Sequence, residues 1–193
     1  MAKHTVIVAD DEGIIAMDVA EILSEAGYTV LGVAKDGIEA YELGRDKRPD
    51  LFVLDIQMPR MDGIQTARRI AADGLGPVVL LTAFAEDDLV AKASESGVYG
   101  YLLKPVDETA LKITAQIALR RYADQQASRK SQRETQAMLD ERKVVDRAKG
   151  LLMERYRVSE EEAYRKIRRM AMNRGCKMGA MAERILRELG VEK

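Results

Sequence analysis

The chain divides into two stretches that differ in the pattern of their hydrophobic and polar positions. Up to about residue 120, short apolar runs rich in β-branched residues alternate with stretches in which apolar residues recur at helical spacing. The five apolar runs are Thr5–Ala9, Val30–Val33, Leu51–Leu54, Val78–Leu81 and Gly100–Leu103. Continuous apolar runs of this length are typical of strands that are buried on both faces, as in parallel sheets.

Amphipathic stretches lie between these runs. They are Ile14–Ala26, Asp36–Lys47, Ile64–Ala72, Asp87–Ser96 and a stretch that starts at Glu108. Parallel neighbours need crossover connections of this kind, because a tight hairpin joins only antiparallel strands. The pattern therefore predicts an α/β domain with a doubly wound, five-stranded parallel sheet.

The second stretch has a purely helical pattern. No Pro or Gly occurs from Val106 to Lys149, which predicts one long helix. Between Ala123 and Ala137 the only apolar side chains are alanines, so this part is either a solvated spacer or a weak coiled coil with a second chain. Three apolar stripes follow and predict a small three-helix domain, whose second helix starts at the capping-box pair Ser159 and Glu162. We predict units at 1–122 and 141–193, joined by a helical linker at 123–140.

Charge separates the same two stretches. The formal net charge of the whole chain is −1, but the part up to Leu119 has 11 basic and 20 acidic residues, a net charge of −9. The part from Arg120 onward has 20 basic and 12 acidic residues, a net charge of +8. A basic helical unit favours nucleic acid as its partner, although a solvated helical surface would show the same charge. No run approaches the roughly 18 apolar residues of a membrane span, so we expect a cytoplasmic protein with no membrane partner.

Polar residues follow several of the predicted strands. Asp10 and Asp11 come after the first strand, Asp55 ends the third, Thr82 ends the fourth and Lys104 follows the fifth. Because the carboxyl ends of parallel strands meet at one edge of the sheet, these side chains should converge. Three carboxylates repel one another unless a cation lies among them, and with one His and one Cys in the chain a metal must be held by oxygen, which suits Mg²⁺. Thr82 and Lys104 could then bind a phosphoryl group on a carboxylate.

Each of these residues also has a simpler explanation. Asp11 could cap the helix that follows it, and a Lys-Pro pair is usually only a turn. It is their joint arrangement after four different strands that favours a site.

Residues 4 to about 120 resemble the receiver domain of two-component response regulators. The segments that carry the resemblance are Val8–Glu12, Leu54–Gly63, Leu81–Ala83 and Tyr101–Pro105. The resemblance implies a flavodoxin-like fold in which Asp55 is the phosphoacceptor and attacks a phosphohistidine of a partner sensor histidine kinase. It also implies that Asp11 and Asp55 bind Mg²⁺ directly and Asp10 through water.

The same resemblance implies roles for five further groups. The backbone carbonyl of Gln57 completes the Mg²⁺ ligands, while Thr82 and Lys104 contact the phosphoryl oxygens. Tyr101 is the aromatic switch that turns inward when Thr82 moves toward the phosphate. The peptide bond before Pro105 is expected to be cis.

Residues 141 to about 189 resemble the ANTAR domain, the RNA-binding module of antiterminator response regulators. The resemblance rests on Glu141–Met153, Ser159–Tyr164, Ala171–Met172 and Met181–Leu186. Met178 and Gly179 depart from the family pattern, which predicts a looser third helix. The candidate RNA contacts are Arg147, Ala148, Lys149 and Gly150, where the glycine admits a close backbone or phosphate approach. For Gly150, close helix packing is the alternative.

The two resemblances together imply a response regulator, not an enzyme, that is switched by phosphorylation. Its output unit would bind paired RNA hairpins in a nascent mRNA leader as a dimer and so prevent transcription termination. Two other functions are kept as alternatives: a receiver-controlled DNA-binding transcription factor and a receiver-based protein-interaction adaptor.

Overall fold

The sheet of the first unit has five parallel strands in the order β2-β1-β3-β4-β5. The computed structural model describes residues 4–83 and 97–189. The strands are β1 (Thr5–Ala9), β2 (Thr29–Ala34), β3 (Leu51–Asp55), β4 (Val78–Thr82) and β5 (Val98–Leu103). The predicted doubly wound, five-stranded parallel sheet is therefore confirmed.

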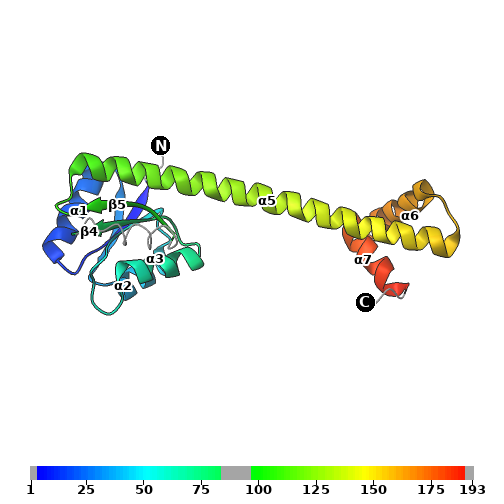
Figure 1. Ribbon diagram of the computed structural model, residues 1–193, viewed down its shortest axis with the longest axis horizontal. Coiled ribbons are helices and arrows are strands. Elements are labelled where there is room, and N and C mark those ends of the chain that lie inside the picture. The colour runs from blue at the N-terminus through cyan, green and yellow to red at the C-terminus, as the bar shows by residue number, and fades with distance from the viewer. Residues whose placement is uncertain (1–3, 84–96, 190–193) are drawn as a thin grey trace. The chain divides into compact units, whose positions relative to one another are not determined.

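Helices cover both faces of this sheet. They are α1 (Gly13–Glu25), α2 (Gly37–Lys47), α3 (Gly63–Ala72) and the first part of α5 (Glu108–Tyr156). Figure 1 shows α2 and α3 on one side of the sheet and α5 on the other. The helix predicted at Asp87–Ser96 lies outside the described residues.

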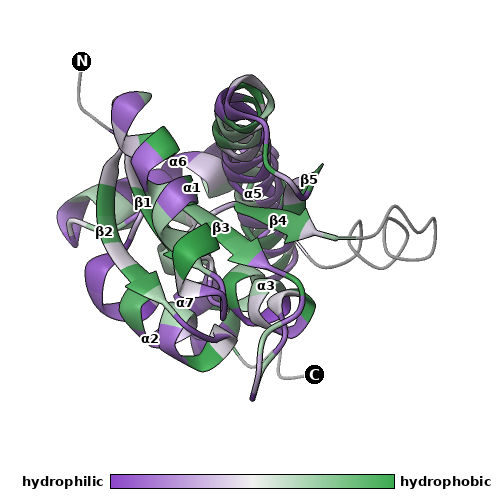
Figure 2. Ribbon diagram, turned by 90° about the vertical axis from the view of Figure 1, so that its left-hand side faces the viewer, coloured by the Kyte–Doolittle hydropathy of each residue, from purple (hydrophilic) through white to green (hydrophobic). Residues whose placement is uncertain are grey.

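Alternate strand residues supply the two cores. Ile7, Phe52 and Leu54 pack with residues of α2 and α3, whereas Val8 and Val53 pack with residues of α1 and α5. Every residue of β3 and β4 is buried, and both strands are green in the hydropathy colouring of Figure 2. The strands are buried on both faces, which explains why they are continuous apolar runs in the sequence.

Helix α5 contains 49 residues and has no break in the predicted linker. Contacts divide the chain into two units, Met1–Gln126 and Ala127–Lys193, so the division falls inside α5 and within residues 123–140. The sequence has no Pro before or after this point that could stop the helix, and Gly150 is tolerated within it. The first of the three predicted helices is thus the last part of α5. The helix ends before Arg157, which has a positive φ of 53°.

The second unit packs this end of α5 against α6 (Glu160–Asn173) and α7 (Met178–Glu188). Its core includes Ala148, Ile167 and Ala182, all with no exposed surface. Helix α6 starts with the capping box predicted from Ser159 and Glu162, in which each residue's side chain bonds the other's backbone N–H.

The N-terminus of helix α7 donates a hydrogen bond to a side chain that is distant in the sequence. Its N-cap residue, Lys177, makes no side-chain cap, but the backbone N–H of Gly179 donates to Glu141 Oε1 over 2.8 Å. A Cβ at position 179 would lie 2.7 Å from Cγ of Glu141. The glycine that departs from the family pattern therefore leaves room for a carboxylate where the helix has unpaired N–H groups.

Candidate functional site

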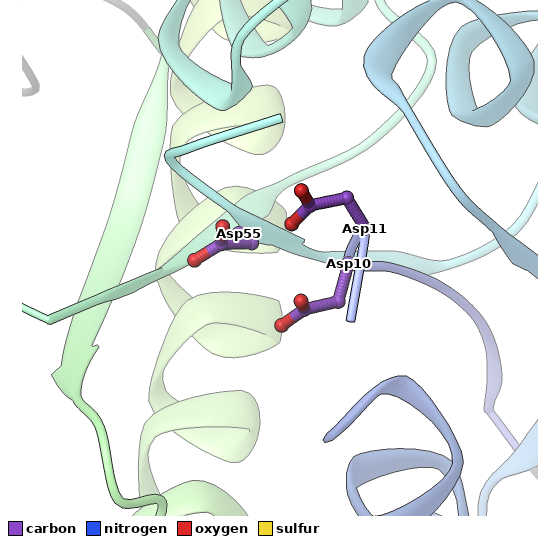
Figure 3. Close-up of side chains that lie close together, drawn as sticks. All are labelled: Asp10, Asp11 and Asp55. Carbon is purple, nitrogen blue, oxygen red and sulfur yellow. The ribbon is translucent and has the colours of Figure 1, made fainter. Parts of the chain in front are cut away.

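Three carboxylates meet at the carboxyl edge of the sheet. Asp10 and Asp11 follow β1, and Asp55 is the last residue of β3, which pairs with β1. One carboxylate oxygen from each residue lies within 4.8 Å of the others. Figure 3 shows Asp10 and Asp11 reaching from the end of β1 toward the end of β3. The structure thus brings together the three acids that the sequence predicted to converge.

Burial differs within this cluster. Asp10 and Asp55 are 1% and 4% exposed, whereas Asp11 is exposed. Helix α1 begins after Glu12, and that residue's side chain makes no cap hydrogen bond. Among the described residues no backbone N–H donates to Asp11 either, so the capping alternative for Asp11 is not observed. Its carboxylate marks the side on which the cluster opens to solvent.

Lys104 closes the cluster on its buried side. Its Nζ lies 2.8 Å from Asp10 Oδ2 and 2.9 Å from Asp55 Oδ1, and the side chain is only 14% exposed. Its backbone N–H donates to the carbonyl of Thr82 over 2.8 Å, which fixes the lysine beside the end of β4. The peptide bond between Lys104 and Pro105 is cis.

The surroundings of the cluster disfavour the ionised form of its buried Asp55 carboxyl group. Burial raises the pKa of the Asp55 carboxyl, and the hydrogen bond and positive charge of Lys104 offset only part of this effect. Burial by itself would lower the pKa of Lys104, but the carboxylates of Asp10 and Asp55 outweigh it and raise that pKa. One lysine thus faces three acids, and a further cation is needed to balance them.

The donor set fits Mg²⁺. All the side-chain donors are carboxylate oxygens, and this ion is bound through one or two carboxylates together with water. Asp10 Oδ2 is fully buried and receives no aligned hydrogen bond from the described residues, although Lys104 lies nearby. The backbone N–H of Gln57 donates to the Asp55 carboxylate. A ligand role for the carbonyl of the same residue stays a prediction.

The two predicted switch residues lie on neighbouring strands. Thr82 ends β4 and is 7% exposed, and Tyr101 lies in β5 opposite Leu80 of β4. Tyr101 as a residue is 49% exposed. In this structure the tyrosine therefore faces outward, while the threonine is buried beside Lys104.

One residue that supports the site was missed in the sequence. The backbone N–H of Gly63 donates to the carbonyl of Ile56, and a Cβ at position 63 would lie 2.2 Å from the backbone oxygen of Asp55. Only glycine allows this approach of α3 to the end of β3. An Asp-Gly pair eight residues after the strand was the available signal, since it marks a turn.

The four candidate RNA contacts occupy different surroundings. Arg147 and Gly150 are exposed on α5, and no atom would lie within 4 Å of a Cβ at Gly150, so close helix packing does not explain this glycine. Ala148 has no exposed surface and lies in the core of the second unit, where its side chain cannot contact RNA. The prediction that Ala148 contacts RNA is therefore corrected, because Ala148 is a core residue.

Lys149 is held by two acids of its own unit. Its Nζ lies 2.8 Å from Asp146 and 2.6 Å from Glu160 at the start of α6, and its side chain is 15% exposed. The hydrogen bonds that its ammonium group donates to these two carboxylates raise the pKa of Lys149. Its charge is therefore already paired within the protein.

An acidic cluster with a buried lysine, at the carboxyl edge of a sheet ordered 2-1-3-4-5, defines a phosphate-accepting receiver. Comparisons with known proteins agree with this class. A family model for the response regulator receiver domain matches residues 6–116, and one for the ANTAR domain matches residues 133–186. The chain belongs to the response regulators that carry a receiver domain followed by an ANTAR domain.

Individual relatives show how far the similarity extends. The transcriptional regulatory protein PdtaR of Mycobacterium tuberculosis H37Rv is 41% identical over 188 residues, which cover 97% of this chain and 92% of PdtaR. The chemotaxis protein CheY of Treponema pallidum is 36% identical over 109 residues, 55% of this chain and 76% of CheY. The solved receiver domain of the response regulator NarL from M. tuberculosis matches with a TM-score of 0.60 and 32% identity, covering 62% of this chain and 98% of that structure.

These domains support a regulatory role in which the output unit binds RNA in transcription antitermination. None of the helices in the described part of the chain has the length and apolar character that crossing a membrane requires.

Proposed function

We propose that a sensor histidine kinase phosphorylates Asp55, and that the phosphorylated chain binds paired hairpins in nascent mRNA leaders as a dimer and prevents termination. The observation that carries the proposal is the contact of Lys104 with Asp55, 2.9 Å apart, inside a cluster of three carboxylates. The alignment with PdtaR supports it, because it spans 97% of this chain and 92% of PdtaR and so includes both matched domains of this chain.

The phosphorylation step needs a carboxylate that can attack phosphorus. An Asp55 oxygen forms the new P–O bond while the P–N bond of the donor phosphohistidine breaks, and the departing imidazole keeps the electron pair of that bond. Lys104 holds Asp55 Oδ1 from the buried side, so the other oxygen is the nucleophile. Asp10, Asp11 and Asp55 would hold Mg²⁺, which neutralises negative charge on the carboxylates and the phosphoryl group.

The response to phosphorylation begins at the two switch residues. The hydroxyl of Thr82 lies at the end of β4, where it can move toward a phosphoryl oxygen. Tyr101 is half exposed on the next strand, so an inward turn of its ring would change the surface of β5. A changed surface of this kind would favour a dimer of the receiver, the helical linker, or both.

The output side depends on a stripe of exposed positions along α5. Lys143, Arg147 and Gly150 are separated by four and three residues, so they share one face of the helix. The two cations neutralise phosphates, and the glycine admits a close approach of the RNA backbone. In a dimer, two output units would engage two hairpins, and the second binding step would gain effective concentration without a new contact.

The test is the affinity of the full chain for a leader RNA with two hairpins, measured with and without an acyl-phosphate mimic at Asp55. We expect tighter binding and a smaller monomer fraction with the mimic. If both stay unchanged, phosphorylation does not switch the protein. Competition with duplex DNA tests the transcription-factor alternative, and the absence of any salt-dependent RNA binding would favour the adaptor.

A further inference from the structure

The second unit has an open groove of about 420 Å³ that the proposed function does not yet use. It lies among α5, α6 and the start of α7. Its lining residues are Met138, Glu141, Arg142, Val145, Asp146, Lys149, Tyr164 and Met178. Along α5 the groove residues and the stripe of Lys143, Arg147 and Gly150 lie on different faces of the helix, and the two sets come closest at Asp146 and Gly150, which are four residues apart.

The groove has flat and polarisable walls. Tyr164 is 43% exposed as a residue, and Met138 is 71% exposed. An exposed tyrosine ring beside a thioether is a surface on which a planar ring can stack. The second unit has only two tyrosines, Tyr156 and Tyr164, and only Tyr164 lines the groove.

The charges that line the groove compensate one another. Arg142 and Lys149 oppose Glu141 and Asp146, and Lys149 is held 2.8 Å from Asp146. Glu141 is engaged by the backbone N–H of Gly179. A groove without net charge offers little attraction to a phosphate, so its ligand should be a neutral group.

One acceptor remains on the rim. Asp146 Oδ1 faces Lys149, whereas Oδ2 has, among the residues that the structure describes, only the Nε of Arg142 at 3.9 Å, and the aspartate side chain is 51% exposed. The hydrogen bond from Lys149 lowers the pKa of Asp146, so the side chain is a carboxylate at neutral pH. A carboxylate accepts hydrogen bonds from ring or exocyclic N–H groups of a base.

We propose that this groove binds one unstacked base of the RNA hairpin loop, stacked on Tyr164, with an N–H group of the base donating to Asp146. This inference rests on the proposed RNA binding and names the part of the RNA that enters the site. Single-stranded loop bases are recognised in this way, by stacking on aromatic rings and hydrogen bonding along their edges.

The first experiment measures the affinity of the full-length wild-type protein for one RNA hairpin and for hairpins in which each loop nucleotide in turn is abasic. We expect one position at which loss of the base weakens binding about 10-fold or more. Equal affinity for all the abasic hairpins overturns the groove proposal but leaves RNA binding intact. Failure of the intact hairpin to bind refutes the proposed function itself.

The second experiment compares Tyr164→Ala with Tyr156→Ala. Tyr156 is a matched control, since it is 48% exposed, lies outside the groove and carries the ammonium of Lys166 at 4.1 Å from its ring centre. We expect Tyr164→Ala to weaken binding about 10-fold and to abolish the effect of the critical abasic position, while Tyr156→Ala keeps that effect. Tyr164→Phe should retain affinity, because the ring remains.

Two results would contradict this outcome. Equal losses in the two alanine variants, with the abasic effect preserved in both, would mean that Tyr164 does not stack on the base. A change in the monomer–dimer equilibrium of Tyr164→Ala, with unchanged RNA affinity, would mean that a second copy of the chain occupies the groove.

Discussion

The acidic cluster of the first unit and the groove of the second both contain paired charges, but they differ in burial and in charge balance. In the cluster, Asp10 and Asp55 are almost fully buried and one lysine faces three acids, so the site is short of positive charge. In the groove, Asp146 and Lys149 compensate each other and the rim is open. The difference indicates that the first site needs a further cation, whereas the second suits a neutral planar ligand.

Two glycines show the same contrast between the units. A Cβ at Gly63 would collide with the backbone of Asp55, while a Cβ at Gly150 would meet no atom within 4 Å. The first glycine is required by the fold. The second lies within α5, where glycine weakens a helix, and no packing contact among the described residues requires it.

The largest expected effect is the loss of phosphorylation in Asp55→Asn. The amide cannot form the acyl phosphate, so mass spectrometry should detect no phosphorylated protein after incubation with a small phosphodonor and Mg²⁺. Asp50→Asn is the matched control. Asp50 lies just before the start of β3, at the opposite end of the strand from Asp55, and its carboxylate accepts a hydrogen bond from the backbone N–H of Thr5 over 2.7 Å. Full labelling of Asp55→Asn would place the phosphoacceptor elsewhere.

The second prediction concerns Mg²⁺ and pH. Mg²⁺ at about 100 times its Kd should stabilise the first unit by about 2.7 kcal/mol. Without the ion, the pKa of Asp55 is higher in the folded than in the unfolded chain. The contribution of Asp55 to the free energy of unfolding is therefore greatest below the unfolded pKa of about 3.9, and it is lost as pH rises through the folded pKa. Asp55→Asn should remove this loss and most of the response to Mg²⁺.

Thermal unfolding of the first unit across pH 3 to about 7, with Mg²⁺ or a chelator, measures both effects. Asp50→Asn again serves as the control. If the wild type and Asp55→Asn respond equally to Mg²⁺, the ion binds outside the acidic cluster.

Most of the first unit could be predicted from sequence because its signals are local. Each buried strand is a continuous apolar run, and each site residue ends a strand or follows one closely, so the topology brings Asp10, Asp55 and Lys104 together. The cap from Ser159 and Glu162 was predictable for the same reason, since the two residues are three apart.

The second unit was harder to predict because its decisive contacts join distant residues. The partner of Lys149, Glu160, is 11 residues away on another helix, and Glu141 contacts Gly179 across 38 residues. No local pattern shows such pairs. The burial of Ala148 is different, since its place in the apolar stripe with Val145 and Leu152 indicates a core position.

The third prediction tests the contrast between the two glycines. Gly63→Ala should destabilise the first unit by about 1–3 kcal/mol, because the collision is with backbone atoms that cannot move aside. Gly150→Ala should stabilise the second unit by about 0.5–1 kcal/mol, because alanine favours the helix and meets free space.

Denaturant unfolding of each variant measures the two changes, and the RNA affinity of Gly150→Ala sharpens the comparison. A more stable protein that binds RNA less tightly would show that the glycine serves the ligand. Unchanged affinity together with the gain in stability would remove Gly150 from the RNA-binding surface.

The smallest expected effect is at the start of α6. Ser159→Ala removes the side-chain acceptor for the N–H of Glu162 and should cost about 0.5 kcal/mol, and it also removes the hydroxyl that donates to the Glu162 carboxylate. The backbone N–H of Ser159 is the main cause of the lowered pKa of Glu162, so this carboxylate stabilises the fold above its unfolded pKa of about 4.3, and the stabilisation is lost as pH falls through the folded value.

Glu162→Gln should therefore flatten the acid dependence of α6, which hydrogen exchange of its amides can follow. Glu161→Gln is the control, because Glu161 lies in the same exposed turn but pairs only with Arg165, at 4.0 Å. This pH dependence is opposite in direction to that expected for Asp55, whose contribution to stability falls as pH rises. If the stability of both units fell in the same way as pH is lowered, the burial of Asp55 would not determine the pH dependence of the first unit. The contrast between a buried and an exposed carboxylate would then fail.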